Sequence, residues 1–381
     1  MNKNETVLLQ LIKKSLFGAD VSFADDTDWD AVQKEAFTQA VVALAAVSIP
    51  DSETDKWCEL ASQSIAHYIQ VLFEQTKLVK LLGANKIPYV ILKGTAAAVY
   101  YPVPKLRTMG DVDFIVDPER YEDTVKLLKE NGYTPETDHD NDRHCGFRRG
   151  RISFELHRRY SHKGCDIEPL ILEGIKNATT KTLNDSEFLT LPDFLNGLLI
   201  LEHITFHIGN ESIFRQVIDW AMFVNCMLDD KTYKQNFLPL LESVGLKTFC
   251  ETLTKMCKMY LGLPDTVTWC DEADRATASE LMQTVLNGAH FNRKKVKKGN
   301  NQMKEFTFIV KRNGLFKSLQ IIGMNNFAIC RKNRFFGAFA WLFQAFRFAW
   351  RGFLALFSGA NLIKEANDGK TKADFYKRLG L

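Results

Sequence analysis

Apolar residues recur at helical spacing through the first part of the chain. The clearest case is the stretch from Trp57 to Leu82, where the repeating positions are Ile65, Tyr68, Ile69, Leu72, Val79 and Leu82. A repeat every three to four residues is typical of an amphipathic helix. The opening residues, MNKNETVLLQLIKKSLFGAD, also fit a short amphipathic helix and are too polar for an export signal. The pattern therefore predicts a helical region over residues 1–85.

The pattern changes after residue 85, where three short segments have the character of strands. One is a β-branched apolar run and two alternate between apolar and polar positions; they are Pro88–Leu92, Asp111–Val116 and Arg151–His157. Gly94 begins an alanine-rich helix after the first strand, and residues 119–131 fit a second helix. Strands and helices mixed over so short a stretch predict an α+β core over residues 86–165.

Helical signals dominate again from about Asp166, which predicts a helical domain over residues 166–290. His203 and His207 are four residues apart on one predicted helix and therefore share a face. Because the glutamate of an H-E-x-x-H zinc motif is missing, we favour a partly buried, hydrogen-bonded histidine pair over a zinc site. A face that lines an active-site cleft is the other interpretation.

Arg215 and Asp219 show the same four-residue spacing on the next predicted helix. Opposite charges at this spacing face each other on a helix surface. We therefore expect them to form a structural ion pair.

The last segment, residues 291–381, is basic and rich in aromatic residues. On a helix over residues 335–357 one stripe would hold Phe335, Phe339, Leu342, Phe346, Trp350, Phe353 and Phe357, and a narrow polar face would hold Gln344, Arg347 and Arg351. Packing of this helix on the protein body is the favoured interpretation. A helix in the membrane interface, with Arg331, Lys332 and Arg334 nearby, is an alternative, and binding of nucleic acid is a third.

Charge is distributed unevenly along the chain. The formal net charge is +3, but residues 293–381 alone hold 19 Lys and Arg against 4 Asp and Glu, so the rest of the chain is acidic. A basic tail fits a polyanionic surface such as the inner face of a membrane, whereas the acidic body argues against nucleic acid as a partner. The 8 cysteines are scattered without metal-ligand spacing, which fits reduced thiols in a cytoplasmic protein.

Two carboxylates stand out in the segment Gly110-Asp111-Val112-Asp113. Residues two apart on a strand point to the same face, with their Cβ atoms roughly 7 Å apart. Magnesium prefers such oxygen ligands and usually keeps water and substrate phosphates in its coordination shell. Asp111 and Asp113 are therefore candidate ligands for Mg²⁺, or Mn²⁺, with Gly110 allowing close approach of a phosphate.

Further residues along the core complete a candidate site. Glu155, on an alternating strand, is the candidate third carboxylate, and His157 shares its face. Where the first strand turns into a helix, a charge, a glycine and a hydroxyl could bind phosphate; these are Lys93, Gly94 and Thr95. Arg107 could neutralise a triphosphate. Each motif alone is commonplace, but their order along the chain favours a catalytic site.

At these residues the chain resembles the nucleotidyltransferase superfamily typified by DNA polymerase beta. It is especially similar to a bacterial nucleotidyltransferase family with the motifs L-K-G, R-x-x-G-D-x-D and E-L-H. Here they are Leu92–Gly94, Arg107–Asp113 and Glu155–His157. The resemblance implies a small mixed-sheet core flanked by N-terminal and C-terminal helical regions. It also implies magnesium-dependent transfer of a nucleoside monophosphate from an NTP such as ATP to an unidentified acceptor hydroxyl or phosphate.

Three departures from the superfamily pattern bear on activity. Thr95 replaces the usual serine, and the gap from Gly94 to Gly110 is longer than in minimal members of the superfamily. The third acid is Glu155 rather than an aspartate, which changes the reach of the carboxylate. An alternative function is therefore a catalytically silent module that binds nucleotide or regulates, with the same fold and a membrane contact through residues 331–357.

Overall fold

The computed structural model describes residues 1–136, 143–160, 167–209, 212–291, 307, 310–311, 314–327, 329–330, 333–356 and 362–381. It divides into two compact units, Met1–Arg293 and Lys294–Leu381. The finer division of the first unit at residues 85 and 165 remains a proposal.

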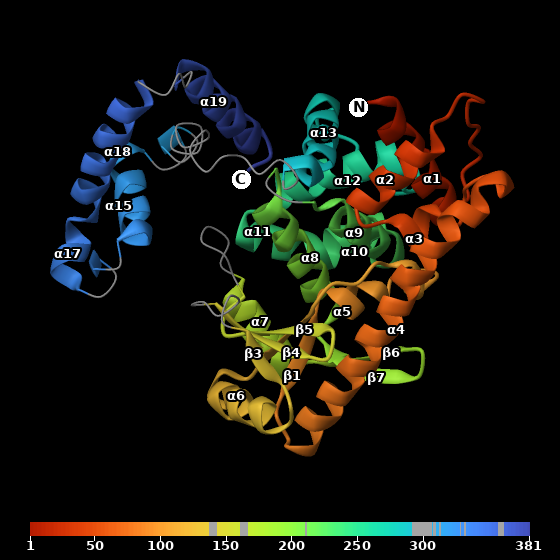
Figure 1. Ribbon diagram of the computed structural model, residues 1–381, viewed down its shortest axis with the longest axis horizontal. Helices are drawn as coiled ribbons and strands as arrows, with labels where there is room; N and C mark the ends of the chain where they lie inside the picture. Colours follow the sequence, from red (N-terminus) through yellow and green to blue (C-terminus); the bar gives the residue numbers. More distant parts are fainter. Residues whose placement is uncertain are drawn as a thin grey trace. The chain divides into compact units, whose positions relative to one another are not determined.

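The first unit opens with helices, as the apolar repeat predicts. They are α1 (Lys3–Phe17), α2 (Trp29–Thr38), α3 (Val42–Ala45), the 3-10 turn η1 (Asp51–Glu53) and α4 (Thr54–Ala84). Asn2 caps α1, because its side chain accepts from the backbone N–H of Glu5 while Glu5 accepts from the N–H of Asn2. The 31 residues of α4 run along the sheet that follows (Figure 1).

A seven-stranded mixed sheet forms the centre of the first unit (Figure 1). Its strands are β1 (Tyr89–Leu92), β2 (Val112–Val116), β3 (Thr134–Glu136), β4 (His144–Arg149), β5 (Ile152–His157), β6 (Thr179–Leu183) and β7 (Ser186–Thr190). Their order is β3-β4-β5-β2-β1-β7-β6, with β2/β5 and β1/β7 parallel and the other neighbours antiparallel. The fold is thus α+β with a mixed sheet.

The sheet extends beyond the segment that the sequence predicts. The hairpin β6–β7 lies after Asp166, where we expected helices, and β7 pairs with β1. The strands are missed because the hairpin is short and largely polar, so its apolar pattern is weak. The short segments linking the strands are α5 (Gly94–Ala98), η2 (Pro104–Leu106), η3 (Pro118–Arg120), α6 (Tyr121–Glu130) and α7 (Glu168–Lys176).

One face of the sheet packs on α4 and α6. Alternate residues of β2 and β5 enter this core with apolar residues of the two helices, among them Tyr68, Leu78, Val112, Phe114, Leu128, Phe154 and Leu156. The period of two along each strand sends the intervening side chains to the other face. Asp113, Glu155 and His157 are among these intervening residues, so the core fixes which face they occupy.

Helices follow the sheet in the first unit. They are α8 (Asp193–His207), α9 (Phe214–Met227), α10 (Asp230–Thr232), a π-helical turn η5 (Tyr233–Phe237), α11 (Leu238–Val244), α12 (Lys247–Leu261) and α13 (Arg275–Phe291). Close packing of α8 on α9 requires Gly197, because a Cβ there would lie 2.1 Å from the Phe223 ring. The indole of Trp220 donates to Thr254 at 2.9 Å and ties α9 to α12.

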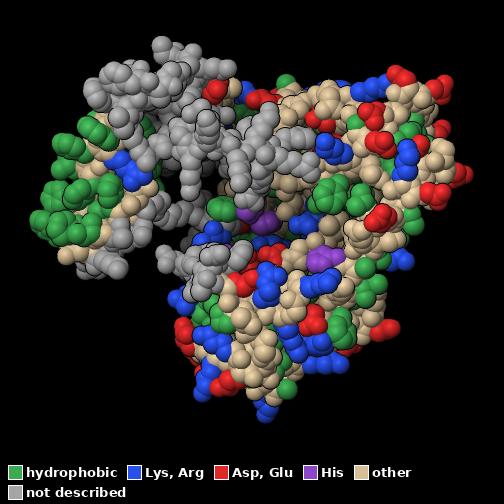
Figure 2. All heavy atoms as spheres, viewed as in Figure 1, with side chains coloured by type: hydrophobic (Ala, Val, Ile, Leu, Met, Phe, Trp, Pro, Cys, Tyr) green, Lys and Arg blue, Asp and Glu red, His purple; other side chains and the backbone are tan. Residues whose placement is uncertain are grey.

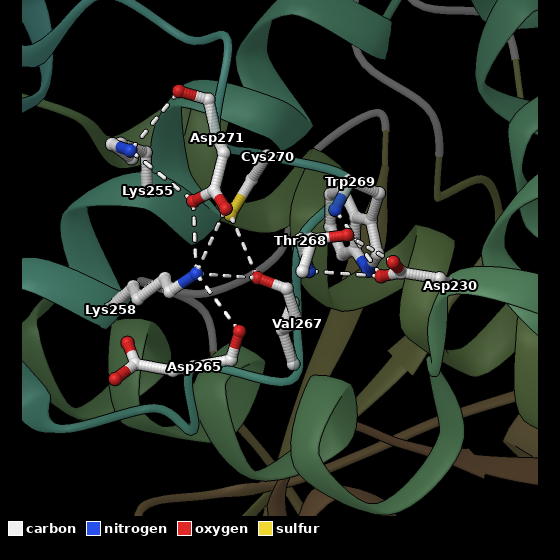
Figure 3. A network of polar contacts seen from close by, with 9 residues as sticks. All are labelled: Asp230, Lys255, Lys258, Asp265, Val267, Thr268, Trp269, Cys270 and Asp271. Atoms are coloured by element: carbon white, nitrogen blue, oxygen red, sulfur yellow. Dashed lines mark hydrogen bonds and ion pairs between the residues drawn. The ribbon is translucent and has the colours of Figure 1, made fainter.

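A polar network holds the loop between α12 and α13 (Figure 3). Lys258 donates to the carbonyl of Val267 and to Asp271 at 2.9 Å each, and Lys255 also contacts Asp271. Asp230 accepts from the backbone N–H of Thr268 at 2.9 Å. These bonds fix a loop without regular structure against the helical domain.

The second unit contains α15 (Leu315–Asn326), α17 (Arg334–Ala338), α18 (Ala340–Leu356) and α19 (Leu362–Arg378). The single helix expected over residues 335–357 is broken at Phe339. Gln320 of α15 satisfies the backbone at this break, donating to the carbonyl of Gly337 at 2.6 Å and accepting from the N–H of Trp341 at 3.0 Å. The break is therefore specified by a tertiary contact rather than by the local apolar pattern.

Candidate functional site

Three neighbouring strands converge on the candidate site. The register pairs Asp113 of β2 with Glu155 of the parallel strand β5 and with Leu92 at the end of β1. Lys93 follows Leu92 directly, so its side chain reaches the same place, and its Nζ lies 2.8 Å from Asp113 Oδ1. The sheet thus brings together residues 20 to 62 positions apart in the sequence.

A cavity of about 710 Å³ contains these side chains. It is lined on the sheet side by Lys93, Gly94, Arg107, Gly110, Asp111, Asp113, Arg143, His144, Glu155, His157 and Tyr160. On the helical side it is lined by Ile200, His203, Phe206, His207, Arg215, Gln216 and Asp219. Eight of the nine site residues that the sequence predicts therefore share one cavity.

Thr95 is the exception. Its side chain is buried, and its hydroxyl donates to Oε1 of Gln75 on α4 at 2.7 Å. The expected phosphate-binding role for this hydroxyl is not what the structure shows, since the hydroxyl joins α5 to α4. The helix that Gly94 opens has only five residues.

The backbone is unusual where β1 meets α5. Lys93 has φ 50° and ψ −140°, and Gly94 has φ 34°. A non-glycine residue in this region is strained and persists only where the surroundings hold it. Here the ion pair of Lys93 with Asp113 supplies that restraint.

Asp113 is the anchor of the acidic cluster. It is buried, and its Oδ1 contacts both Lys93 Nζ at 2.8 Å and His157 Nε2 at 2.7 Å. Burial would raise the pKa of Asp113, but Lys93 and His157 outweigh burial and hold it well below its usual range. Burial lowers the pKa of Lys93, but the negative charges of Asp113, Asp111 and Glu155 outweigh burial and raise that pKa overall. Asp113 is therefore ionised and Lys93 charged at neutral pH.

The other two carboxyl groups are destabilised as anions. The charge of Asp113, followed by burial, raises the pKa of Asp111. Burial, followed by the charges of Asp113 and Asp111, raises the pKa of Glu155 to about 8, and a hydrogen bond with Asp111 adds to this shift. The cluster retains a proton near neutral pH because too little positive charge lies beside its carboxylates. A bound divalent cation would supply that charge and replace the proton.

The histidine beside the cluster is neutral. Burial lowers the pKa of His157 although Asp113 opposes the shift. A neutral imidazole that faces a carboxylate through Nε2 donates that proton, which leaves Nδ1 as an acceptor. Nδ1 is buried and has no hydrogen-bond partner among the described residues. His157 therefore orients Asp113.

The donor set fits a divalent cation. Within the described chain, ligand atoms of Asp113, Glu155 and His157 lie within 4.8 Å of one another. Asp111, which the sequence places in the set, interacts with both other carboxylates. Three carboxylate donors suit magnesium or manganese, and the imidazole of His157, whose Nε2 proton is donated to Asp113, positions one of the three carboxylates.

Several lining residues escaped the sequence analysis. His144, on the unpredicted strand β4, lies 3.6 Å from Glu155, and its ring is 5.4 Å from that of His157. Arg143 lies over the ring of Phe206, and Tyr160 lies 5.3 Å from Lys93 Nζ. Only an alternation at residues 144–149 could have indicated that strand.

The histidine pair of α8 faces the cavity. The rings of His203 and His207 are 4.5 Å apart, and both side chains line the cavity. The metal-ligand group found among the described residues does not include them. Both side chains therefore lie where the cleft-lining interpretation places them.

The predicted ion pair within α9 is replaced by a tertiary one. Asp219 receives two hydrogen bonds from Arg107, at 2.7 Å from both Nε and Nη2, and a third from Tyr101 at 2.8 Å. Arg215 instead donates to the carbonyl of Thr108. Asp219 is buried, and the bidentate hydrogen bonds from Arg107 satisfy both of its carboxylate oxygens.

Comparison with known proteins identifies the family. Residues 25–262 match the model of a family described as uncharacterised nucleotidyltransferase, and this stretch is more than half of the chain. The chain belongs to this nucleotidyltransferase family. No curated protein matches it in sequence. Among solved structures it is similar to the crystal structure of an antigenic nucleotidyltransferase-like protein from Paracoccidioides brasiliensis, with 16% identity, a TM-score of 0.33, and coverage of 54% of this chain and 96% of that chain.

Proposed function

We propose that this protein transfers a nucleoside monophosphate from an NTP, such as ATP, to an acceptor hydroxyl or phosphate, and releases pyrophosphate. The observation that carries the proposal is the acidic cluster in the cavity. Asp113 and Glu155 are paired on the parallel strands β2 and β5, Asp111 directly precedes β2, and the pKa values of Asp111 and Glu155 are raised. Membership of a nucleotidyltransferase family supports the same chemistry.

Asp111, Asp113 and Glu155 would hold magnesium or manganese. Such ions activate the attacking oxygen and stabilise the leaving pyrophosphate. The protein contributes the positions of the ligands: His157 and Lys93 fix Asp113, and the β2/β5 register places Glu155 beside it. Lys93 also brings a positive charge to the wall where phosphates would bind, next to the open backbone of Gly94.

Label transfer tests the proposal. The full chain is incubated with magnesium, each α-³²P-labelled NTP in turn, and fractionated cell extract as the source of acceptor. We expect label in a product that depends on magnesium and is absent with EDTA and with Asp111→Asn. Label transfer by Asp111→Asn at the wild-type rate would contradict the metal assignment.

A catalytically silent nucleotide-binding module is the second candidate. It is favoured by the raised pKa of Glu155, about 8, since a protonated third acid weakens the second metal position. Calorimetry that shows binding of Mg-ATP, with no labelled product over the full set of extract fractions, would select this function over transfer.

Metal binding is expected to depend on pH through Glu155. Its pKa of about 8 lies above the ordinary value of 4.5, so the metal-free fold holds a proton that the unfolded chain releases. This contribution to stability is complete below about pH 4.5 and is lost as the pH rises through 8, because the unfolded state then binds fewer protons.

A cation must displace that proton. We expect the affinity for Mg²⁺ to rise about tenfold per pH unit from pH 6 to 8 and to level off above 8. Calorimetry in two buffers of different ionisation enthalpy should show release of about one proton at pH 7. Glu155→Gln should bind the ion weakly at every pH; an unchanged pH slope in that variant would contradict the assignment.

We further propose that the second unit contacts anionic membrane surfaces. In the part of the chain that the structure describes, no helix combines the length and apolar character needed to cross a bilayer. Five predicted stripe residues are nevertheless exposed, from 42% to 78%: Phe335, Phe339, Leu342, Phe346 and Trp350. Hydrophobic side chains gather on this part of the second unit in Figure 2.

The opposite face of α18 packs within the unit. Gln344, expected on the polar face, is buried and accepts from Asn326 of α15 at 2.9 Å. The aromatic stripe therefore points outward, and the basic excess of residues 293–381 matches an anionic surface. The side chains of Arg331, Lys332, Arg334, Arg351, Phe353 and Phe357 lie outside the described residues.

Vesicle sedimentation tests this contact. The full chain should sediment with phosphatidylserine-containing vesicles at low salt and less at high salt. Phe346→Ser with Trp350→Ser should weaken binding at least about tenfold, because two exposed aromatic side chains that the membrane would bury are lost. Phe73→Ser, at a phenylalanine of α4 that is 60% exposed, is the control. Equal sedimentation of all variants would contradict the proposal and favour packing on the protein body.

A further inference from the structure

Two arginines flank the turn that carries Gly110 and Asp111, and their hydrogen bonds differ. The Nε–Nη2 edge of Arg107 is occupied by the two oxygens of Asp219, and Nη1 contacts the carbonyl of Thr108 at 3.4 Å and the sulfur of Met109 at 3.3 Å. Bidentate binding of a triphosphate through that edge would require breaking a buried ion pair.

In Arg215 the Nε–Nη2 edge of the guanidinium is open, whereas in Arg107 Asp219 occupies it. Its Nη1 donates to the carbonyl of Thr108 at 3.0 Å, which fixes the plane of the guanidinium. Its Nε is buried and has no hydrogen-bond partner within the described chain. The side chain lines the cavity, and its Nη2 lies 3.8 Å from the position of a Cβ added to Gly110. The Nε–Nη2 edge is the edge that binds carboxylate or phosphate bidentately.

Among the residues that the structure describes, the charge of Arg215 also lacks a nearby anion that is not already paired or part of the acidic cluster. Burial, followed by the charge of Arg107, lowers the pKa of Arg215, while Asp219 and Asp111 oppose the shift. Asp219 is already matched by Arg107, and Asp111 belongs to the acidic cluster. A buried cation without an ion pair of its own is costly unless a ligand supplies the countercharge.

The neighbouring residue adds a polar group to the same wall. Gln216 lines the cavity, and its Oε1 is buried without a hydrogen-bond partner among the described residues. An acceptor beside a cationic fork can receive a hydroxyl of the molecule whose anionic group the arginine binds. Two adjacent side chains of α9 thus face the cavity with unused hydrogen-bonding capacity.

We propose that Arg215 binds a phosphate group through its Nε–Nη2 edge, at the Gly110 turn of the cavity that Glu155 and Asp113 also line. The inference rests on the proposed function, which supplies the phosphate as part of the NTP or of a phosphorylated acceptor. Arg215 and Arg107 then exchange the roles that their sequence positions indicate: Arg107 is the structural partner of Asp219, and Arg215 is the phosphate ligand.

Binding measurements on the full chain test the assignment without turnover. Magnesium pyrophosphate and Mg-ATP are titrated into wild type, Arg215→Gln, Arg215→Lys and the control Arg151→Gln, an exposed arginine of the β4–β5 turn. Loss of a charged bidentate contact should weaken binding about ten- to a hundredfold in Arg215→Gln. The affinity of Arg215→Lys should lie between those of wild type and Arg215→Gln, since lysine keeps the charge but cannot form the bidentate contact. Arg151→Gln should match wild type.

A comparison of the three probes shows whether the bound phosphate belongs to the NTP or to the acceptor. If the phosphate belongs to the NTP, Arg215→Gln weakens pyrophosphate and Mg-ATP alike. If it belongs to the acceptor, Mg-ATP binding is retained and binding of inorganic phosphate to the Mg-ATP complex is weakened. Equal binding of all three probes by Arg215→Gln and wild type overturns the inference. Thermal unfolding checks that each variant is folded.

The two proposals fail in different ways. If Asp111→Asn abolishes label transfer while Arg215→Gln binds every probe normally, the proposed function stands and the phosphate site falls. If no label is transferred but Arg215→Gln loses pyrophosphate binding, the phosphate site stands in a silent module.

Discussion

Replacing Asp111 by Asn is expected to lower the rate of nucleotide transfer by about a thousandfold or more without loss of stability. A metal ligand contributes several kcal/mol to the transition state, and about 1.4 kcal/mol corresponds to a factor of ten. Asp113 and burial destabilise the charge of Asp111 in the fold, so removing that charge relieves repulsion. In EDTA the variant should therefore unfold at the wild-type temperature or above it.

Asp113→Asn should lose the same activity but with the opposite effect on stability. Asp113 is the partner of Lys93 and His157, and its loss leaves a half-buried ammonium without its carboxylate. Breaking a buried pair by removing one member costs about 3–5 kcal/mol.

Rates with labelled NTP and thermal unfolding in EDTA, measured side by side, separate the two variants. Asp123→Asn, at an exposed carboxylate of α6, is the control for both measurements. Equal destabilisation by Asp111→Asn and Asp113→Asn would show that Asp113 does not anchor the cluster.

Arg107→Gln is expected to destabilise the first unit strongly, by as much as Asp113→Asn. The pair with Asp219 is buried on both sides and bidentate, at 2.7 Å. Loss of one member leaves a buried carboxylate uncompensated, at about 3–5 kcal/mol. For a unit of this size that corresponds to a fall of roughly 10 °C in the unfolding temperature.

A double-mutant cycle identifies the origin of this loss. Asp219→Asn should be similarly destabilising, and Arg107→Gln with Asp219→Asn should be less destabilised than the sum of the two single changes, because no charge is then left unpaired. Additive effects would mean that the two side chains do not depend on each other. Arg215→Gln serves as a comparison, since Arg215 has no ion pair with Asp219 in the structure and should cost little stability.

Local patterns predict much of the candidate site. The alternation around Asp113 and Glu155 indicates which side chains share a face, because strand geometry sets a period of two regardless of the rest of the fold. The helices of residues 1–85 and the family resemblance at Arg107–Asp113 follow equally from short-range pattern. The structure brings Arg107, Gly110, Asp111, Asp113 and Glu155 together in one cavity.

Tertiary contacts decide what local patterns cannot. The spacing of Arg215 and Asp219 predicts an ion pair within one helix. Asp219 is instead bound by Arg107, which lies 112 residues earlier and forms two hydrogen bonds with the buried carboxylate. Thr95 follows a glycine at the start of a helix, as in a phosphate-binding loop, yet its hydroxyl donates a hydrogen bond to Gln75. The hairpin β6–β7 gains its place by pairing with β1, a contact that its own weak pattern does not encode.

Diffraction from crystals with manganese and a non-hydrolysable ATP analogue tests the central claim most directly. The account predicts an anomalous peak at the carboxylates of Asp111, Asp113 and Glu155, with the triphosphate of the analogue beside it. A manganese peak elsewhere in the cavity, or an analogue bound away from these three side chains, would contradict it.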